Sequence, residues 1–342
     1  MRRAGRDACD IERVGGHDAA VTTGRFAPSP SGPLHMGNLR TALLAWCFVR
    51  AEGGRFLVRT EDLTTAAPDA GAAAAAARHE RGQLDDLAVV GLDHDGEVVR
   101  QSERAALYDA AIDRLEAAGL TYPCFCTRRE IREAVSAPHG PTTEGAYPGT
   151  CAALTDVERA ARRADGRRAA VRLRAGGEVV DAVDELHGPV SAAVDDFVLR
   201  RGDGVAAYNL AVVVDDATQG VDQVVRGDDL LETTPRQVLL QRLLGLRTPR
   251  YAHVPLVLGP DGERLAKRHG AVTLRDRLGL GQSPHEVVGL LAASLGLAAP
   301  GEPVTAGEVL ARFRPDLLPR DPWVWAEPPT GPGGGSAGVP EV

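Results

Sequence analysis

The feature that most constrains this 342-residue chain is a rigid turn between a predicted strand and a predicted helix. Residues 23–26 form a short strand-like run, and residues 24–38 read GRFAPSPSGPLHMGN, with prolines and glycines that stop the strand abruptly. Apolar residues then recur at helical spacing over about 35–50, and a Gly-Gly pair ends the helix before a second strand at 55–59. A strand–turn–helix–strand unit is typical of an α/β domain with a parallel sheet.

The chemistry of this turn favours a nucleotide. His35, Gly37 and Asn38 fall in the first turn of the predicted helix. The start of a helix carries unpaired N–H groups and a partial positive charge, which together bind phosphate. His35 can add an imidazole donor, and Gly37 allows a base or ribose to approach the backbone.

Composition narrows the class of protein. A net charge of −8, with 25% charged and 44% hydrophobic residues, is ordinary for a soluble globular protein and argues against indiscriminate coating of nucleic acid. No run of about 18 apolar residues occurs, and residues 1–20 lack an apolar core segment, so we expect neither a membrane span nor a secretory signal. Five cysteines are too few for a disulfide framework in so long a chain and predict reduced thiols in the cytoplasm.

The basic residues are distributed unusually, with 38 arginines and a single lysine, Lys267. Lys267 lies in the run RLAKR at 264–268, after a Gly-Pro-Asp-Gly turn at 259–262. A single residue of a type that the chain otherwise avoids is a candidate functional residue.

These segments resemble the class I aminoacyl-tRNA synthetases. H-x-G-N at 35–38 resembles the HIGH motif, and the preceding RFAPSP resembles the glutamyl branch of that class. RLAKR resembles the KMSKS loop, with Ala266 where the family usually has serine. The resemblance covers about 21–325 and implies a Rossmann-type α/β catalytic domain. The catalytic residues that it implies are His35, Asn38 and Lys267, and the ATP-binding residues are His35, Gly37, Asn38 and Lys267.

The same resemblance implies a site for L-glutamate, with ATP accompanied by Mg²⁺. A side-chain carboxylate is suited to arginine, which can bind it through two parallel hydrogen bonds. Arg25 and Arg226 are the candidates for this role, Glu61 for holding the α-ammonium group, and Tyr208 for a hydroxyl contact. The glutamate-binding residues that the resemblance implies are Arg25, Phe26, Ala27, Pro28, Ser29, Glu61, Tyr208 and Arg226.

Three cysteines predict a metal site. Cys124, Cys126 and Cys151 lie in one region, and zinc in proteins takes four ligands in a tetrahedron, with thiolates among the preferred donors. From chemistry alone, His139 is a possible fourth ligand, and three free thiols without metal are the alternative. The C-x-C followed by Y-x3-C resembles the zinc element of glutamyl-Q tRNA(Asp) synthetases, which implies Tyr147 as the fourth ligand of one structural ion.

We predict further helix starts from capping patterns, at Thr234 with Pro235 and Gln237, at Ser283 with Glu286, and at Thr305 with Glu308. The alanine run at 72–77 favours a surface helix, and residues 200–204 favour a hairpin turn. Seven arginines within 159–174 predict either a face for RNA phosphates or an ordinary solvated surface. The predicted units are flexible tails at 1–20 and 326–342, catalytic halves at 21–120 and 186–270, a zinc insertion at 121–185 and a C-terminal helical subdomain at 271–325.

The number of residues that follow the RLAKR run at 264–268 indicates which branch of the family the chain resembles. After Arg268 only 74 residues remain, too few for the predicted helices together with the large anticodon-binding domain of a full glutamyl-tRNA synthetase. The chain therefore resembles the glutamyl-Q tRNA(Asp) synthetases. That resemblance implies activation of glutamate by ATP without tRNA and transfer to queuosine at the wobble position of tRNA(Asp). The partner would be the anticodon stem-loop, and the enzyme would be a cytoplasmic monomer.

Three alternatives stay open. One is a truncated glutamyl-tRNA synthetase that charges a tRNA 3′ end. Another is a catalytically silent RNA-binding paralogue, which Ala266 supports best. A related cysteine ligase is the third, and it is disfavoured because Arg25 and Arg226 suit a carboxylate side chain.

Overall fold

The structure is a computed structural model that describes residues 21–63, 70–135, 147–270 and 272–326. The predicted tail at 1–20, and all of the second tail except residue 326, lie outside these ranges. In chain order the elements are β1 (Thr23–Phe26), α1 (Met36–Arg50), β2 (Arg55–Thr60), α2 (Ala70–Val89), β3 (Val99–Arg100), α3 (Ala105–Ala117), β4 (Thr121–Cys124), α4 (Arg128–Val135), α5 (Asp156–Ala164), β5 (Ala170–Leu173), β6 (Glu178–Asp184), β7 (Gly188–Val194), β8 (Val198–Arg200), α6 (Tyr208–Thr218), β9 (Gln223–Gly227), α7 (Thr234–Leu244), β10 (Arg250–Val254), β11 (Val257–Leu258), α8 (Leu274–Gly279), α9 (Pro284–Ala293), α10 (Ala306–Arg312) and β12 (Trp323–Val324).

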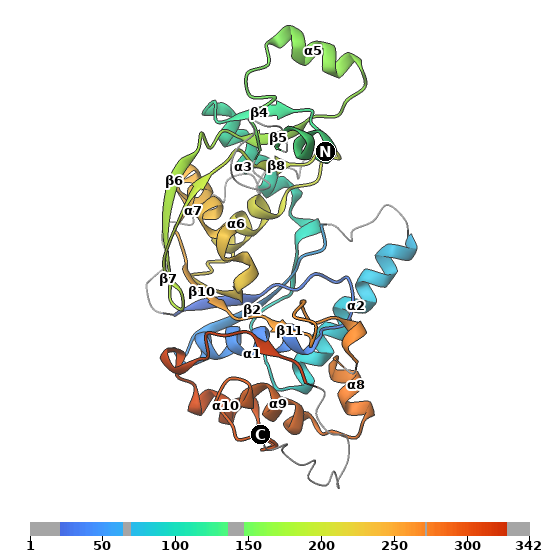
Figure 1. Cartoon of the computed structure of the whole chain (residues 1–342), viewed down its shortest axis with the longest axis vertical. Coiled ribbons are helices and arrows are strands. Elements are labelled where there is room, and N and C mark those ends of the chain that lie inside the picture. The colour runs from blue at the N-terminus through green and yellow to red at the C-terminus, as the bar shows by residue number, and fades with distance from the viewer. Residues whose placement is uncertain (1–20, 64–69, 136–146, 271, 327–342) are drawn as a thin grey trace, which may run out of the picture.

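A seven-stranded sheet forms the centre of the molecule (Figure 1). Its strand order is β3-β2-β1-β9-β10-β6-β7, and every pair is parallel except the β6–β7 hairpin. The first strand therefore lies between β2, which follows it in sequence, and β9, which comes nearly two hundred residues later. Such a reversal of strand order opens a crevice at the carboxyl ends of the two strands, where open α/β sheets bind their ligands.

Both faces of the sheet are buried, as parallel strands require. Successive residues of a strand point to opposite faces, so Phe56 joins the core beneath the sheet and Leu57 the core above it. Val225 and Val224 divide in the same way. Helix α1 and the C-terminal helices supply the lower core, whereas α3, α6 and α7 supply the upper one (Figure 1).

The strand–turn–helix–strand prediction is confirmed by β1, α1 and β2. The alanine run is part of the 20-residue helix α2, also as predicted. At 200–204 the chain makes the expected turn, in which the N–H of Arg201 donates to the carbonyl of Val205 at 2.8 Å.

Two of the three predicted capping patterns are confirmed. Ser283 with Glu286 and Thr305 with Glu308 form capping boxes at the starts of α9 and α10. The third predicted helix, α7, also starts at the expected place, with Pro235 in its first turn, but the capping role of Thr234 is wrong because Thr234 is the first residue of the helix rather than its cap. A 3₁₀ helix, η4 (Asp228–Thr233), runs directly into α7 and leaves no extended residue to act as a side-chain cap.

A smaller unit carries the cysteines. Strands β4, β5 and β8 form an antiparallel three-stranded sheet at one end of the molecule, and α5 projects beyond it (Figure 1). Its small core contains Tyr122, Cys124, Phe125, Tyr147 and Cys151. Strand β6, which the sequence places at the end of the insertion, pairs with β10 in the main sheet. The unit boundaries drawn from the sequence stay a prediction.

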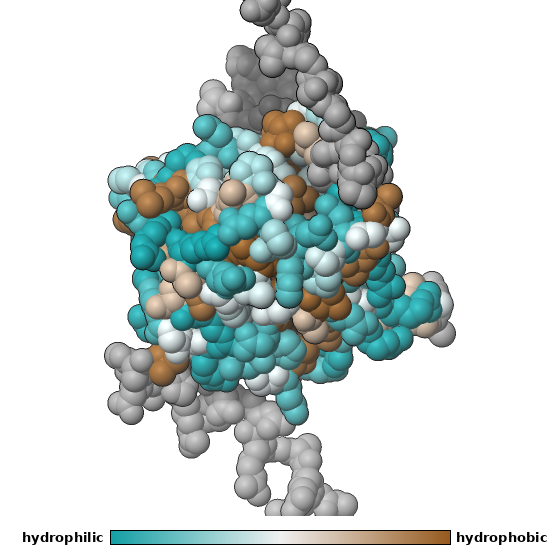
Figure 2. Space-filling model, turned by 90° about the horizontal axis from the view of Figure 1, so that it is seen from below, coloured by the Kyte–Doolittle hydropathy of each residue, from teal (hydrophilic) through white to brown (hydrophobic). Residues whose placement is uncertain are grey.

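The C-terminal segment returns to the catalytic body. Strand β12 pairs in parallel with β11, just before the loop that holds Lys267. On the face viewed in Figure 2, hydrophilic residues predominate over the visible described surface, and hydrophobic ones are scattered between them. Within the described ranges, no helix combines the length and the apolar character needed to cross a bilayer.

Candidate active site and thiol cluster

A cleft of about 370 Å³ opens at the reversal of strand order, over the carboxyl ends of β1 and β9. Its walls come from the turn after β1, the start of α1, the end of β9 and the segment around β11. Every residue predicted to bind ATP or glutamate whose side chain the structure describes lines this cleft. Those residues are Arg25, Phe26, Ala27, Pro28, Ser29, His35, Gly37, Asn38, Glu61, Tyr208 and Arg226.

The turn before α1 is held by a reciprocal cap. The backbone N–H of Asn38 donates to Nδ1 of His35 at 3.2 Å, and the backbone N–H of His35 donates to Oδ1 of Asn38 at 3.1 Å. Gly37 leaves room for this cap, because a Cβ at this position would lie only 3.0 Å from Nδ1 of His35. The two polar side chains of the motif are therefore fixed before any nucleotide arrives.

The cap also sets the protonation of His35. Since Nδ1 accepts a hydrogen bond, the neutral ring carries its proton on Nε2. Burial, with a smaller contribution from the charge of Arg264, lowers the pKa of His35 to about 4. The imidazole is therefore a neutral donor near pH 7, able to approach phosphate oxygens without acting as a permanent cation.

The loop that follows β11 closes the other side of the cleft. Leu265 and Arg264 line the cavity, and Lys267 begins the short 3₁₀ helix η5 (Lys267–His269). The position of the Lys267 side chain lies outside the described part of the structure. The loop is anchored by His269, whose Nδ1 accepts the backbone N–H of Ala266 at 3.0 Å. Its Nε2 lies 3.0 Å from Oδ2 of Asp261.

Arg25 occupies a charge-balanced part of the cleft. Its Nε donates to Oδ1 of Asp216 at 3.0 Å, and the same oxygen accepts a 2.7 Å hydrogen bond from Arg59. Arg59 is fully buried and also lies 3.6 Å from Oε1 of Glu61. Burial raises the pKa of Glu61, although the neighbouring Arg59 and Arg25 oppose that shift.

Arg226 is held differently. Its Nε donates to Nε2 of His253 at 2.9 Å, its Nη1 to Oε1 of Gln237 at 2.8 Å, and its Nη2 to Oγ1 of Thr234 at 2.9 Å. Thus Thr234 and Gln237, which the sequence suggests as capping residues of α7, bind this arginine instead.

Sequence reasoning missed the residues that support the two arginines. Asp216 follows a buried valine run in the segment AYNLAVVVDDA. A carboxylate after such an apolar run is a signal that could have identified it as the partner of a buried cation. His253 is a fully buried histidine inside β10, and no pattern in its surroundings marked it.

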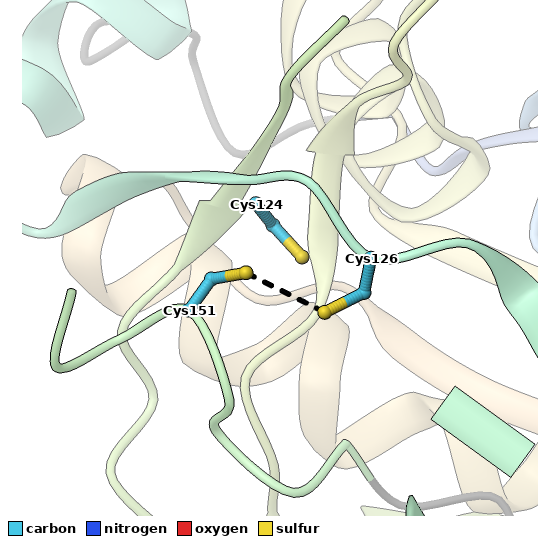
Figure 3. Close-up of side chains that lie close together, drawn as sticks. All are labelled: Cys124, Cys126 and Cys151. Carbon is cyan, nitrogen blue, oxygen red and sulfur yellow. Dashed lines mark hydrogen bonds between the residues drawn. The ribbon is translucent and has the colours of Figure 1, made fainter. Parts of the chain in front are cut away.

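The thiol cluster forms as predicted from the spacing. The sulfur atoms of Cys124, Cys126 and Cys151 lie within 4.8 Å of one another, and those of Cys126 and Cys151 are 3.4 Å apart. In Figure 3 all three thiols point toward a common centre. The hydroxyl of Tyr147 lies 3.3 Å from the sulfur of Cys124 and 3.6 Å from that of Cys126.

These four donors fit a zinc ion. With Zn–S bonds of about 2.3 Å, two thiolates on one tetrahedral ion lie about 3.8 Å apart, close to the separations found here. Burial raises the pKa of Cys126 to about 12 and that of the Tyr147 phenol as well. The described residues hold no competing ligand set, and His139, the other candidate for the fourth position, lies outside them.

Part of the predicted basic patch supports this cluster. The guanidinium of Arg172 stacks over the Tyr147 ring, 3.6 Å from its centroid, and Arg174 lies over the Tyr122 ring. Arg167 pairs with Glu130 at 2.8 Å. Helix α5 carries Arg162 and Arg163 and buries none of its residues, so that part of the patch faces solvent.

Comparison with known proteins agrees with this arrangement. Residues 20–298 match the family model described as tRNA synthetases class I (E and Q), catalytic domain. The glutamyl-Q tRNA(Asp) synthetase of Nocardia farcinica is 61% identical over 301 residues, 88% of this chain and 92% of that protein. That of Symbiobacterium thermophilum is 50% identical over 87% of this chain and 94% of its own length.

A solved structure agrees at lower identity. The glutamate tRNA ligase of Elizabethkingia meningosepticum, crystallised in complex with its amino acid, superposes with a TM-score of 0.74 at 25% identity. The match covers 90% of this chain and 67% of that one. The cleft at the strand reversal, the family model and the two curated relatives lead to one conclusion: the chain belongs to the glutamyl-Q tRNA(Asp) synthetases, ligases built on the class I aminoacyl-tRNA synthetase catalytic domain.

Proposed function

We propose that this enzyme activates L-glutamate with ATP and Mg²⁺, without needing tRNA, and transfers the glutamyl group to queuosine at the wobble position of tRNA(Asp). The observation that carries the proposal is the meeting of two kinds of group in one cleft. The turn containing His35 and Asn38 is suited to phosphate, and Arg25 and Arg226 are suited to an acidic amino acid. We propose that the reaction takes place in the cytoplasm, where cysteine thiols stay reduced.

Glutamate would lie between the arginines. Its side-chain carboxylate would pair with Arg226, whose guanidinium is held by α7 and β10. Its α-ammonium group would approach Glu61, and Tyr208 would donate a hydroxyl hydrogen bond. Because Arg25 is already paired with Asp216, we assign it mainly to positioning and to contact with the α-carboxylate.

Activation would then join glutamate to AMP. An oxygen of the α-carboxylate attacks the α-phosphorus of ATP, the bond to the bridging oxygen breaks, and pyrophosphate leaves with that electron pair. The Nε2–H of neutral His35 and the ammonium of Lys267 would stabilise the charge that grows on the phosphate oxygens. Magnesium would accompany the nucleotide as its counter-ion.

Transfer follows from the mixed anhydride. A hydroxyl of the cyclopentene-diol of queuosine attacks the activated carbonyl, and the anhydride bond to AMP breaks. AMP leaves with that electron pair, the hydroxyl proton passes to the departing phosphate or to water, and an ester to the modified base forms. The exposed arginines of α5 are candidates for contact with the tRNA phosphates.

We also propose one structural zinc ion, held by Cys124, Cys126, Cys151 and Tyr147. The fit of the three sulfur atoms and the phenol oxygen supports it. Four protein ligands would leave no open position for water or substrate, so the ion would stabilise the fold of its unit rather than take part in the reaction.

The proposal is tested in two steps with the purified chain. Glutamate-dependent ATP–pyrophosphate exchange should occur with no tRNA present. Labelled glutamate should then be transferred to tRNA(Asp) that contains queuosine, and not to the same tRNA without the modification. A matched substrate, queuosine-containing tRNA(Asp) that lacks its 3′-terminal adenosine, should still accept glutamate.

The alternatives give different results. A truncated glutamyl-tRNA synthetase would charge tRNA(Glu) and would require an intact 3′ end. A silent paralogue would show no exchange at saturating glutamate, ATP and Mg²⁺, and a cysteine ligase would show exchange with cysteine instead.

A further inference from the structure

The two arginines predicted to bind glutamate, Arg25 and Arg226, differ in how their charge is balanced. Arg25 has a carboxylate, Asp216, at 3.0 Å. Arg226 has no carboxylate within 4.0 Å among the described residues, and its three hydrogen bonds all go to neutral acceptors. A buried cation without a close counter-ion is costly, so such a site is suited to a ligand that brings the missing negative charge.

The first acceptor, His253, is kept in one tautomer. Its Nδ1 lies 2.6 Å from Oδ2 of Asp184, and the same oxygen accepts the backbone N–H of His253 at 3.0 Å. A proton on Nδ1 leaves Nε2 as a bare acceptor for Nε of Arg226. Asp184 therefore stabilises the arrangement from the far side of the imidazole, one ring width from the guanidinium.

The second acceptor, Gln237, is also oriented by a neighbour. Its Nε2 donates to Oδ1 of Asn209 at 3.1 Å, so its Oε1 faces Nη1 of Arg226 at 2.8 Å. His253 and Gln237 are both buried, with 0% and 1% of their surface exposed. Neither side chain can therefore exchange its partner for water without movement of α7 or β10.

Three of the five guanidinium N–H groups are used in this way, which leaves one on each terminal nitrogen. A carboxylate can accept from both terminal nitrogens at once. A carboxamide offers one oxygen and turns an NH₂ donor toward the other N–H group, so it forms fewer hydrogen bonds and brings no charge.

We propose that His253, Gln237 and Asp184 are positioning residues that present Arg226 as a cation without a close counter-ion, and that this arrangement makes the site prefer glutamate to glutamine. The inference rests on the proposed function in one respect, namely that glutamate is the amino acid bound. It adds the residues, distant from the substrate, that set the preference.

The sharpest test is Gln237→Glu, which brings a carboxylate to the Nη1 of Arg226. The affinities of the full-length chain for labelled glutamate and glutamine are measured by equilibrium dialysis without ATP. Wild type should prefer glutamate. Gln237→Glu should weaken glutamate binding by about tenfold or more and affect glutamine less, so that the preference falls.

Gln241→Glu is the matched control. It makes the same change one turn further along α7, at an equally buried glutamine whose Nε2 donates to the hydroxyl of Tyr251. Gln237, in contrast, accepts a hydrogen bond from Arg226. It should retain the wild-type preference. An unchanged preference in Gln237→Glu, or an equal loss in both variants, would overturn the proposal.

A second pair of variants covers the case in which Gln237→Glu does not fold. His253→Leu removes the acceptor, whereas His253→Gln keeps a neutral one of similar size. We expect the preference for glutamate to fall in the first variant and to return toward wild type in the second. Equal preferences in the two folded variants would contradict the role of His253.

These measurements are independent of catalysis. Selective binding of glutamate by wild type, combined with no pyrophosphate exchange, would contradict the proposed function but not this inference. Wild-type binding without preference for glutamate would overturn the inference even if exchange occurs.

Discussion

The cleft and the thiol cluster are assembled over very different distances in sequence. The hydrogen bond from Arg25 to Asp216 joins residues 191 positions apart, whereas the contact between Cys124 and Tyr147 spans 23. The cleft therefore depends on closure of the whole sheet, but the cluster needs only one segment of chain to fold on itself. This difference indicates that the cluster can be disturbed without dismantling the cleft.

The two regions meet at helix α7. The backbone N–H of Tyr147 donates to Asp195 at 2.8 Å, and Arg236 pairs with the same carboxylate at 2.6 Å. Arg236 is followed directly by Gln237, which holds Arg226. Any effect of the cluster on activation should therefore reach the glutamate side of the cleft before the phosphate side.

The largest expected effect comes from a change in the cleft, and it tests whether the cleft and the thiol cluster act separately. Lys267→Ala should reduce the rate of ATP–pyrophosphate exchange by about 10²–10³-fold, as removal of one preorganised electrostatic donor does elsewhere. Glutamate binding should change little, since the charge acts mainly on the transition state. Steady-state exchange kinetics and metal analysis of the same preparation measure both regions at once.

Lys267→Arg is the control for charge. It keeps the cation on a bulkier, forked group, so activity should fall between wild type and Lys267→Ala. Wild-type exchange in Lys267→Ala would show that the loop assignment is wrong.

The next effect comes from the thiol cluster. Cys151→Ser should reduce bound zinc from one ion per chain to a small fraction, because a serine hydroxyl is a poor replacement for a thiolate. Glutamate transfer to tRNA should fall more than pyrophosphate exchange. Thermal unfolding should show a less stable chain, since a structural ion contributes directly to folding.

Cys47→Ser is the matched variant, because Cys47 is a buried cysteine in α1 outside the cluster. It should keep its zinc. Loss of exchange in Cys151→Ser as severe as the loss of transfer would contradict the separation of the two regions, and wild-type chain without zinc would remove the metal site altogether.

A smaller effect is expected from Tyr147→Phe, which removes only the phenol oxygen. Three thiolates remain, so zinc should still bind, with affinity lowered by about tenfold or more, because even loss of a residue that only supports a ligand costs that much. Competition with a chromophoric chelator measures the change. Undiminished affinity would assign the fourth position to water or to His139.

Much of the fold could be predicted because its signals are local. The turn at 24–38, the helix after it and the capping boxes at Ser283 and Thr305 each depend on residues a few positions apart. The cleft residues could be named because the motifs around them resemble a known family. The thiol cluster could be predicted because its spacing is itself the signal.

The surroundings of Arg226 could not be predicted in this way. Its partners come from α7 and β10, and Asp184 lies 69 positions from His253. A histidine inside a strand, and a glutamine three residues after a threonine, carry no local mark of their shared partner. The same spacing at Thr234 even favoured a cap, and only the 3₁₀ helix before it, together with Arg226, excludes that role.

The smallest expected effect is an absence of titration at His35. This result would support a cleft whose capped side chains are held in place before the nucleotide binds. The folded pKa of about 4 lies below the ordinary value of 6.5, so His35 stays neutral as pH falls from 8 to about 5. Its contribution to stability is fully present above pH 6.5 and is lost as pH falls through about 4. The ratio of exchange rates between wild type and His35→Gln, which cancels other titrations, should therefore be constant over that range. A fall in the ratio near pH 6.5 would show an ordinary, solvated imidazole and would contradict the capped geometry. Arg264→Ala should raise the pKa of His35 only slightly, because the guanidinium of Arg264 is largely exposed and its charge is screened by water.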